Sequence, residues 1–86
     1  MELVDVAEWY QQKRSGLGAE FSDEVRRALM QVKERPDAYP KTFLSARRCL
    51  ISRFPYSIIF KQTGDVVWVL AVAHTSRRPG YWKERF

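Results

Sequence analysis

Residues 66–73 constrain the fold of this chain more than any other segment, because all eight positions are apolar. The run is rich in valine and contains a tryptophan, which are residues that favour a β-strand, and its length is typical of a strand. Residues 62–65 precede it and include Gly64, which suits a hairpin turn. Since no position of the run is polar, both of its faces should be covered, and we predict a central strand.

Two shorter runs before this segment predict further strands, over residues 47–54 and 56–61. In the second of them alternate positions divide into two faces, with Tyr56, Ile58 and Phe60 on one and Ser57, Ile59 and Lys61 on the other. Pro55 lies between the two runs, where no ladder donor is needed. Together with residues 66–73 these runs predict an antiparallel sheet.

The first part of the chain has helical periodicity instead. Apolar residues recur at three- and four-residue spacing from Leu3, and this first stripe ends near Gly16. A second stripe covers residues 18–34 and stops before Pro36, which cannot continue a helical hydrogen-bond ladder. Because the link between the two stripes is short, they predict a helical hairpin, followed by a turn-rich connector over residues 36–45.

These elements predict an α+β fold, with an N-terminal helical hairpin packed on one face of a small antiparallel sheet. The chain has 86 residues and is 45% hydrophobic, so it is long enough for one small core. We therefore expect a single domain over residues 1–86.

Charge is divided unequally along the chain. Residues 1–40 carry six Lys/Arg and eight Asp/Glu, a net charge of −2, whereas residues 41–86 carry nine Lys/Arg and two Asp/Glu, a net charge of +7. A basic half with few acids attracts polyanions or acidic partners, and such binding weakens with salt. The alternative is that the high charge serves only solubility.

The composition argues against several classes of protein. With one cysteine and one histidine the chain has neither a disulfide framework nor a structural zinc site of its own. Its apolar runs are too short to span a membrane, and its N-terminus does not have the pattern of a signal peptide. We expect a cytoplasmic protein without a cofactor or a metal.

An ordered set of motifs along nearly the whole chain resembles the RelE/ParE superfamily of toxins from type II toxin–antitoxin modules. The set comprises residues 8–10 and 16–21 in the helical region, Pro36, Tyr39 and Pro40 in the connector, Arg47 and Arg48, residues 54–58, residues 69–74, and a tail with Arg77, Arg78, Pro79, Trp82 and Arg85. No single motif is specific, but their order is.

The chain departs from this family at its start. Members usually begin with a β-strand, whereas the helical pattern here begins at Leu3, so the first strand of the family is expected to be missing or truncated. An open edge of the sheet would result, and open edges pair with other chains. We expect an antitoxin segment or a second copy of the chain to cover it.

The resemblance implies a growth-inhibiting toxin that a cognate antitoxin neutralises. ParE-like members bind DNA gyrase and poison it, while RelE-like members cut messenger RNA in the ribosome. We rank gyrase inhibition slightly ahead, with ribosome-dependent RNA cleavage as the alternative. A further alternative is an inactive toxin that binds only its antitoxin.

RNA cleavage without a metal needs a group that transfers a proton and cations that stabilise charge on the phosphate. If the chain is RelE-like, the catalytic residues would be His74, Arg53, Arg77 and Tyr81. His74 is the natural group for proton transfer, because its ordinary pKa lies near neutral pH. The alternative for His74 is a structural role through hydrogen bonds.

A wider set of cations is expected to bind phosphate or the protein target. It comprises Arg47, Arg48, Arg53, Arg77, Arg78, Lys83 and Arg85. For Arg47 and Arg48 the alternative is solvation or pairing with helix carboxylates such as Glu24. Cys49 lies within a predicted strand, and we expect it to be an unreactive small apolar residue.

Overall fold

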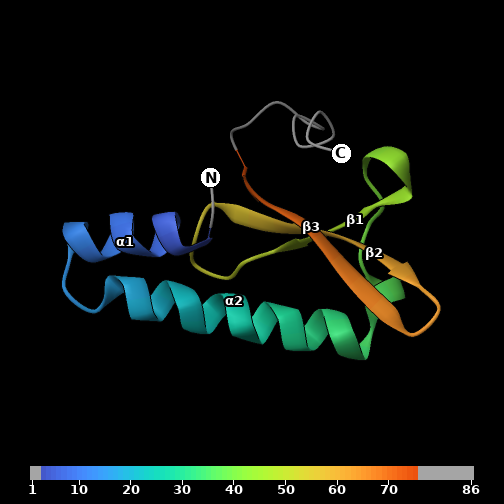
Figure 1. Ribbon diagram of the computed structural model, residues 1–86, viewed down its shortest axis with the longest axis horizontal. Helices are drawn as coiled ribbons and strands as arrows, with labels where there is room; N and C mark the ends of the chain where they lie inside the picture. Colours follow the sequence, from blue (N-terminus) through green and yellow to red (C-terminus); the bar gives the residue numbers. More distant parts are fainter. Residues whose placement is uncertain (1–2, 76–86) are drawn as a thin grey trace.

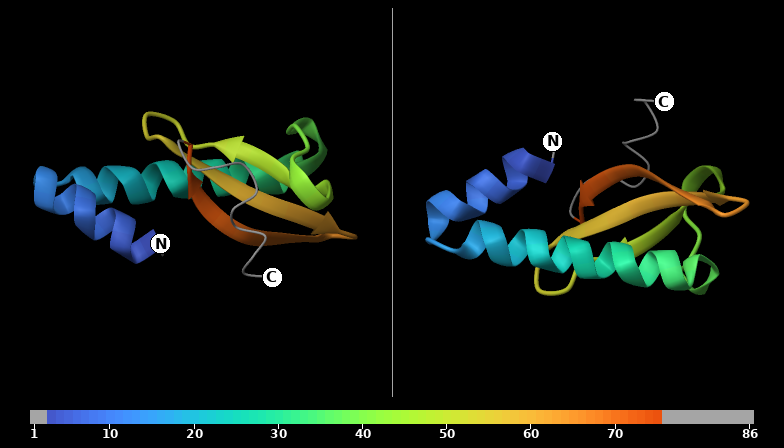
Figure 2. Two further views of the ribbon diagram at one scale, coloured as in Figure 1. Left: turned by 90° about the horizontal axis from the view of Figure 1, so that it is seen from above. Right: turned by 60° about the horizontal axis from the view of Figure 1, so that its bottom comes forward.

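A computed structural model describes residues 3–75 of the chain (Figure 1). Helices α1 (Leu3–Lys13) and α2 (Leu17–Glu34) form a hairpin, and two 3₁₀ turns, η1 (Pro36–Ala38) and η2 (Phe43–Ser45), lead to the strands. Strands β1 (Arg47–Leu50), β2 (Tyr56–Thr63) and β3 (Val66–His74) form an antiparallel sheet. Seen from above, the strands cross α2, and α1 lies beside α2 (Figure 2). The predicted α+β arrangement is confirmed.

The two helices approach each other closely at Gly18, near the start of α2. A Cβ atom at this position would lie 2.6 Å from the backbone oxygen of Ala7, so a side chain does not fit there. The Gln11 side-chain oxygen accepts hydrogen bonds from the backbone N–H groups of Gly16 and Gly18, at 3.0 and 3.3 Å. A side chain of α1 thereby satisfies backbone donors at the start of α2, which would otherwise lack intrahelical partners.

The strand order β1-β2-β3 makes β2 the central strand. Residues 56–60 of β2 are buried at all five positions, as expected for a strand covered on both faces. The prediction that residues 66–73 form the central strand is therefore wrong, because within the described sheet β3 lies at an edge.

A β-bulge explains why β3 is apolar without alternation. Ile59 pairs with Ala71 and Phe60 pairs with Val69, which leaves Leu70 as the extra residue. Val67 and Val69 before the bulge and Val72 after it therefore lie on the same face as the core-facing residues of β2, although their spacing breaks the period of two. Odd-numbered residues face the core before the bulge and even-numbered residues face it after the bulge, so the run has to be apolar at both kinds of position.

The boundaries of the first two strands also differ from the prediction. β1 ends at Leu50, because the chain turns through residues 51–55, where Arg53 has a φ of 72°. Ile51 N–H donates to Tyr56 O across this turn, at 2.9 Å. β2 extends to Thr63, so only Gly64 and Asp65 separate it from β3, and Gly64 adopts a φ of 60° that glycine tolerates well.

The main core lies between the helices and the sheet, and Phe21 of α2 is at its centre. Its ring lies 5.1 Å from that of Phe54, 5.4 Å from that of Tyr10 and 5.7 Å from that of Tyr56, measured between centroids. Such edge-on and tilted contacts bring the turn after β1, the start of β2 and both helices together. A smaller buried cluster, Ala46, Ile59 and Ala73, lies on the other face of the sheet.

The described residues contain neither a strand before α1 nor a helix with the length and apolar character needed to cross a membrane.

Candidate functional site

The end of β3 brings two of the predicted catalytic residues, His74 and Arg53, into the same region. Thr75 N–H donates to Pro55 O at 2.9 Å, so the end of β3 lies beside the turn that carries Arg53. The His74 ring meets the Tyr56 ring edge-on, with 5.0 Å between the centroids. His74 therefore packs against the aromatic core at the C-terminal end of β3.

Arg53 is engaged in an ion pair between the sheet and the helical hairpin. Its guanidinium donates to a Glu20 carboxylate oxygen at 3.0 Å, and Arg14 donates to the other oxygen at 2.9 Å. The hydrogen bond from Arg53, together with the charges of both arginines, holds the pKa of Glu20 below its ordinary value. Since two arginines share one carboxylate, this cluster keeps an excess positive charge.

Arg47 has a structural contact of its own. Its guanidinium donates to Tyr39 O at 2.6 Å and so ties β1 to the connector after α2. One of the alternatives for Arg47 and Arg48 is pairing with a helix carboxylate such as Glu24. In the described residues the buried Glu24 carboxylate accepts a hydrogen bond from Arg27 on the same helix instead.

Five of the predicted site residues lie outside the described residues. They are Arg77, Arg78, Tyr81, Lys83 and Arg85.

Arg48 points to a different surface, which we call the helix-free face, namely the face of the sheet opposite α2. Arg48 pairs with Ile59, and Lys61 pairs with Trp68, so these side chains lie on the side away from the helices. The Trp68 side chain is 57% exposed although it is one of the largest apolar groups of the chain. Strands β1, β2 and β3 contain no acidic residue, so the basic character of Arg48 and Lys61 is not offset within the described strands.

Further apolar side chains surround this basic pair. Leu50 at the end of β1 and Val66 at the start of β3 share the helix-free face and are exposed. Leu44 in η2 is 62% exposed, and both Leu44 and Ser45 have a positive φ, at 58° and 63°. A leucine rarely adopts that backbone conformation, and such strain is concentrated at functional sites. The turn stands on the side of the sheet away from α2 (Figure 1).

Sequence reasoning included Arg48 but missed Lys61 and Trp68. The available signal was the alternation in residues 56–61, which puts Lys61 on the face of Ser57 and Ile59. That signal did not indicate which face the helices leave open, nor that Trp68 would stand opposite Lys61.

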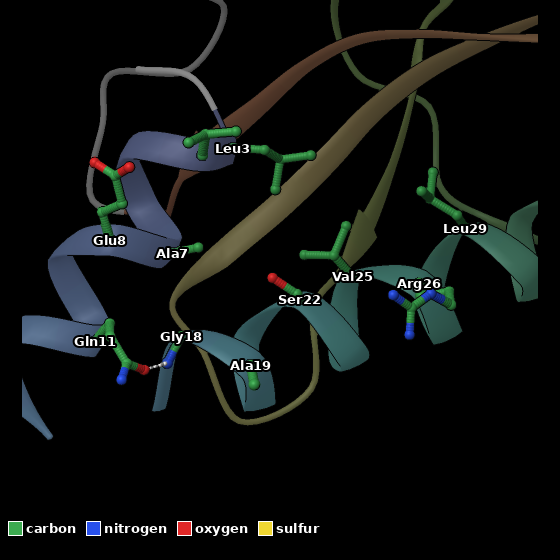
Figure 3. A pocket seen from close by; sticks show the side chains of 11 residues that line it. Leu3, Ala7, Glu8, Gln11, Gly18, Ala19, Ser22, Val25, Arg26 and Leu29 are labelled. Carbon is green, nitrogen blue, oxygen red and sulfur yellow. Dashed lines mark hydrogen bonds between the residues drawn. The ribbon is translucent and has the colours of Figure 1, made fainter. Parts of the chain in front are cut away.

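A second surface lies in the angle of the helical hairpin. It is an open groove of about 530 Å³ between α1 and α2. Apolar side chains, among them Leu3, Ala7, Val25 and Leu29, extend into it from both helices, while Glu8 and Arg26 lie at its rim (Figure 3). An apolar groove of this kind suits the apolar side of a partner segment.

The thiol of Cys49 is buried, as expected, and burial raises its pKa although the Tyr39 side chain acts in the opposite direction. A thiol of this kind is a poor nucleophile. Residues 3–75 contain no group of three or more His, Cys, Asp or Glu side chains placed to hold a metal ion.

Within the described residues, the helix-free face and the hairpin groove are both candidate surfaces for a partner. Comparisons of the chain with family models, with curated proteins and with solved structures find no match, so the resemblance to the RelE/ParE toxins stays a prediction.

Proposed function

We propose that the protein is the toxin of a type II toxin–antitoxin module, and that it inhibits DNA gyrase by binding through the helix-free face. The observation that supports this proposal is the exposed Trp68 opposite Lys61, with Arg48 on the same sheet face, where Leu50 and Val66 are exposed as well. The site requires binding only, without a particular catalytic geometry.

A protein target fits this surface because of its mixed chemistry. Exposed apolar patches mark sites of protein–protein contact. Tryptophan and arginine are enriched among the residues that dominate the binding energy of such sites. Leu44 adds an exposed aliphatic side chain on a strained turn at the rim. Phosphate binding alone would not use these aliphatic groups.

The antitoxin would bind the same half of the chain. Residues 41–86 carry a net charge of +7, so an acidic antitoxin segment would be complementary to them. Its binding would cover the basic surface and block access to the target. We expect the affinity to fall as salt is added, because part of it is electrostatic.

A gyrase supercoiling assay with purified protein tests the proposal. Trp68→Ala and Arg48→Glu should each weaken inhibition by about tenfold or more, the size of effect expected at the centre of an interface. Arg35→Glu is the matched control for charge, because Arg35 is exposed at the end of α2, away from the helix-free face and from the hairpin groove, and should have no effect on inhibition. Undiminished supercoiling in the presence of the folded wild-type chain would refute the proposal.

RNA cleavage in the ribosome is the second candidate, and the pairing of Lys61 with Trp68 favours it. An exposed indole next to cations forms a stacking platform for an unpaired base, with phosphate contacts beside it. His74 would transfer the proton at a separate point of the RNA, since it lies at the other end of β3 from Trp68 and on the opposite face of the sheet. Primer extension on a translated messenger distinguishes the two: cuts at codons in the ribosomal A site that disappear in His74→Ala support cleavage, and intact messenger excludes it.

Expression in cells tests the remaining alternative. Growth arrest that the antitoxin relieves supports an active toxin, whereas normal growth with abundant folded protein indicates an inactive one that only binds its antitoxin.

A further inference from the structure

The two edges of the described sheet differ in how they are protected. Along β1 the connector runs beside the strand, because Lys41 forms a bridge with Arg47 and Arg48 N–H donates to Pro40 O at 3.0 Å. This edge strand is also short, with four residues, and it carries two arginines. Short, charged and covered edges are the usual protection against pairing with another chain.

The edge formed by β3 has none of these features within the described residues. β3 is nine residues long and contains no charged residue before His74, and within residues 3–75 it pairs only with β2. Its first half is also the exposed half, with Val66 and Val69 each 48% exposed and Trp68 more so. These side chains are on both faces of the strand, so neither face of this half is fully covered.

The hairpin turn determines which backbone groups face outwards. With Gly64 and Asp65 alone in the turn, Thr63 and Val66 are the closing pair, whose N–H and C=O groups point at each other. The direction alternates along an antiparallel strand. The backbone groups of Trp68 therefore point towards β2, and those of Val67 and Val69 point to the outer edge.

We propose that a second copy of this chain pairs with this edge, antiparallel and centred on Trp68. A two-fold axis at Trp68 sets Val67 opposite Val69 of the second copy, and Val69 opposite Val67. Each of these pairs exchanges two backbone hydrogen bonds. Trp68 then lies directly opposite the same residue of the second copy, in a non-hydrogen-bonded pair whose side chains are close.

A second copy suits this edge because of its chemistry. A strand that pairs here must be uncharged and apolar on both faces, and residues 66–69 have that character themselves. The groove between α2 and the edge is lined by Lys33, Glu34 and Asp65 among others, so charges of both signs flank it and two copies do not repel each other there.

The bulge at Leu70 limits the extent of this pairing, because the strand bends where the extra residue is inserted. With the axis at Trp68 the regular pairing covers residues 67–69 of each copy. A contact of this length is smaller than a standard protein interface, so we expect a reversible dimer. The two-fold axis is perpendicular to the sheet, so both helix-free faces lie on the same side of a joined sheet. The inference rests on the sheet edge alone and does not depend on the target of the protein.

Sedimentation of the purified chain over a range of concentrations tests the dimer. We expect the dimer fraction to rise with concentration, and Val69→Lys to raise the dissociation constant by about tenfold or more, because like charges then meet near the axis. Val69→Thr is the control, since a neutral β-branched residue keeps the strand. Circular dichroism and the melting temperature establish that each variant is folded.

Disulfide trapping tests the register. In Trp68→Cys the two new thiols face each other across the axis, at the Cβ separation that a disulfide needs, so mild oxidation should give covalent dimers. In Val66→Cys the new thiol faces Leu70 of the second copy, and little crosslinking is expected. A chain that stays monomeric at all concentrations, a dimer that Val69→Lys leaves unchanged, or equal crosslinking of the two cysteine variants would each overturn the proposal.

Discussion

Arg53 donates a 3.0 Å hydrogen bond to Glu20, and this contact joins the turn after β1 to the start of α2. The two residues are 33 positions apart in the sequence, so the fold alone brings them together. Arg53 holds the left-handed backbone conformation of the turn and at the same time pairs with a carboxylate of the helical hairpin. A residue expected to bind phosphate therefore has a structural partner in the described part of the chain.

The Glu20 contact predicts how stability depends on pH. Because the folded pKa of Glu20 is lowered, its stabilising contribution is present above the unfolded pKa, about 4.3 for a glutamate, and is lost as the pH falls through the folded value. Glu20→Gln should therefore flatten the decline of stability in acid. Urea unfolding from pH 6 down to about pH 3 measures this effect.

Asp23→Asn is the control for this experiment, because Asp23 is an exposed carboxylate that pairs with Arg26 within α2. An acid profile of Glu20→Gln with the same slope as the wild type would contradict the prediction.

The positive φ of Arg53 predicts a difference between two truncations. Arg53→Gly and Arg53→Ala both remove the ion pair with Glu20, so the comparison isolates the backbone. Alanine is strained in the left-handed region and glycine is not, so the glycine variant should be more stable by about 1 kcal/mol. Chemical denaturation of the two variants measures the difference, and a more stable alanine variant would show that the turn does not need this conformation.

The close approach of the helices predicts that Gly18→Ala is destabilising. In an open helix this change would stabilise the protein by up to about 1 kcal/mol. Here the new methyl group meets the Ala7 backbone, so we expect a loss of about 1–3 kcal/mol. Ser22→Ala, at an exposed position of α2, should change stability by less than about 0.5 kcal/mol. Thermal unfolding of both variants decides the sign, and a stabilised Gly18→Ala would contradict the observed helix contact.

The buried thiol of Cys49 predicts slow modification. Its raised pKa and its burial both keep it from reacting as a thiolate, so a thiol reagent should modify the native chain far more slowly than the chain in urea. The expected ratio of rates is at least about a hundredfold, because reaction requires opening of the core. Comparable rates in both conditions would mean that this part of the sheet opens readily.

Much of the architecture could be predicted from local patterns. The helix stripes that begin at Leu3 and end before Pro36 and the turn at Gly64 all depend on neighbours within a few residues, and each matches the structure.

The errors came where a residue's environment depends on distant parts of the chain. An apolar run can be a central strand or an edge strand with a bulge, and the pairing of Phe60 with Val69 decides between them. The first strand ends at Leu50 because the chain turns at Arg53, which has a left-handed backbone conformation. An arginine in the sequence does not indicate that conformation.

The sequence by itself determined the elements, their order and the basic character of the second half, because periodicity, turn residues and charge are properties of short segments. Only the tertiary structure decided that Trp68 and Lys61 lie together on the helix-free face and that β3 lies at an edge of the described sheet. Those outcomes depend on cross-strand register and on which face α2 covers, and both are set by packing between residues far apart in the chain.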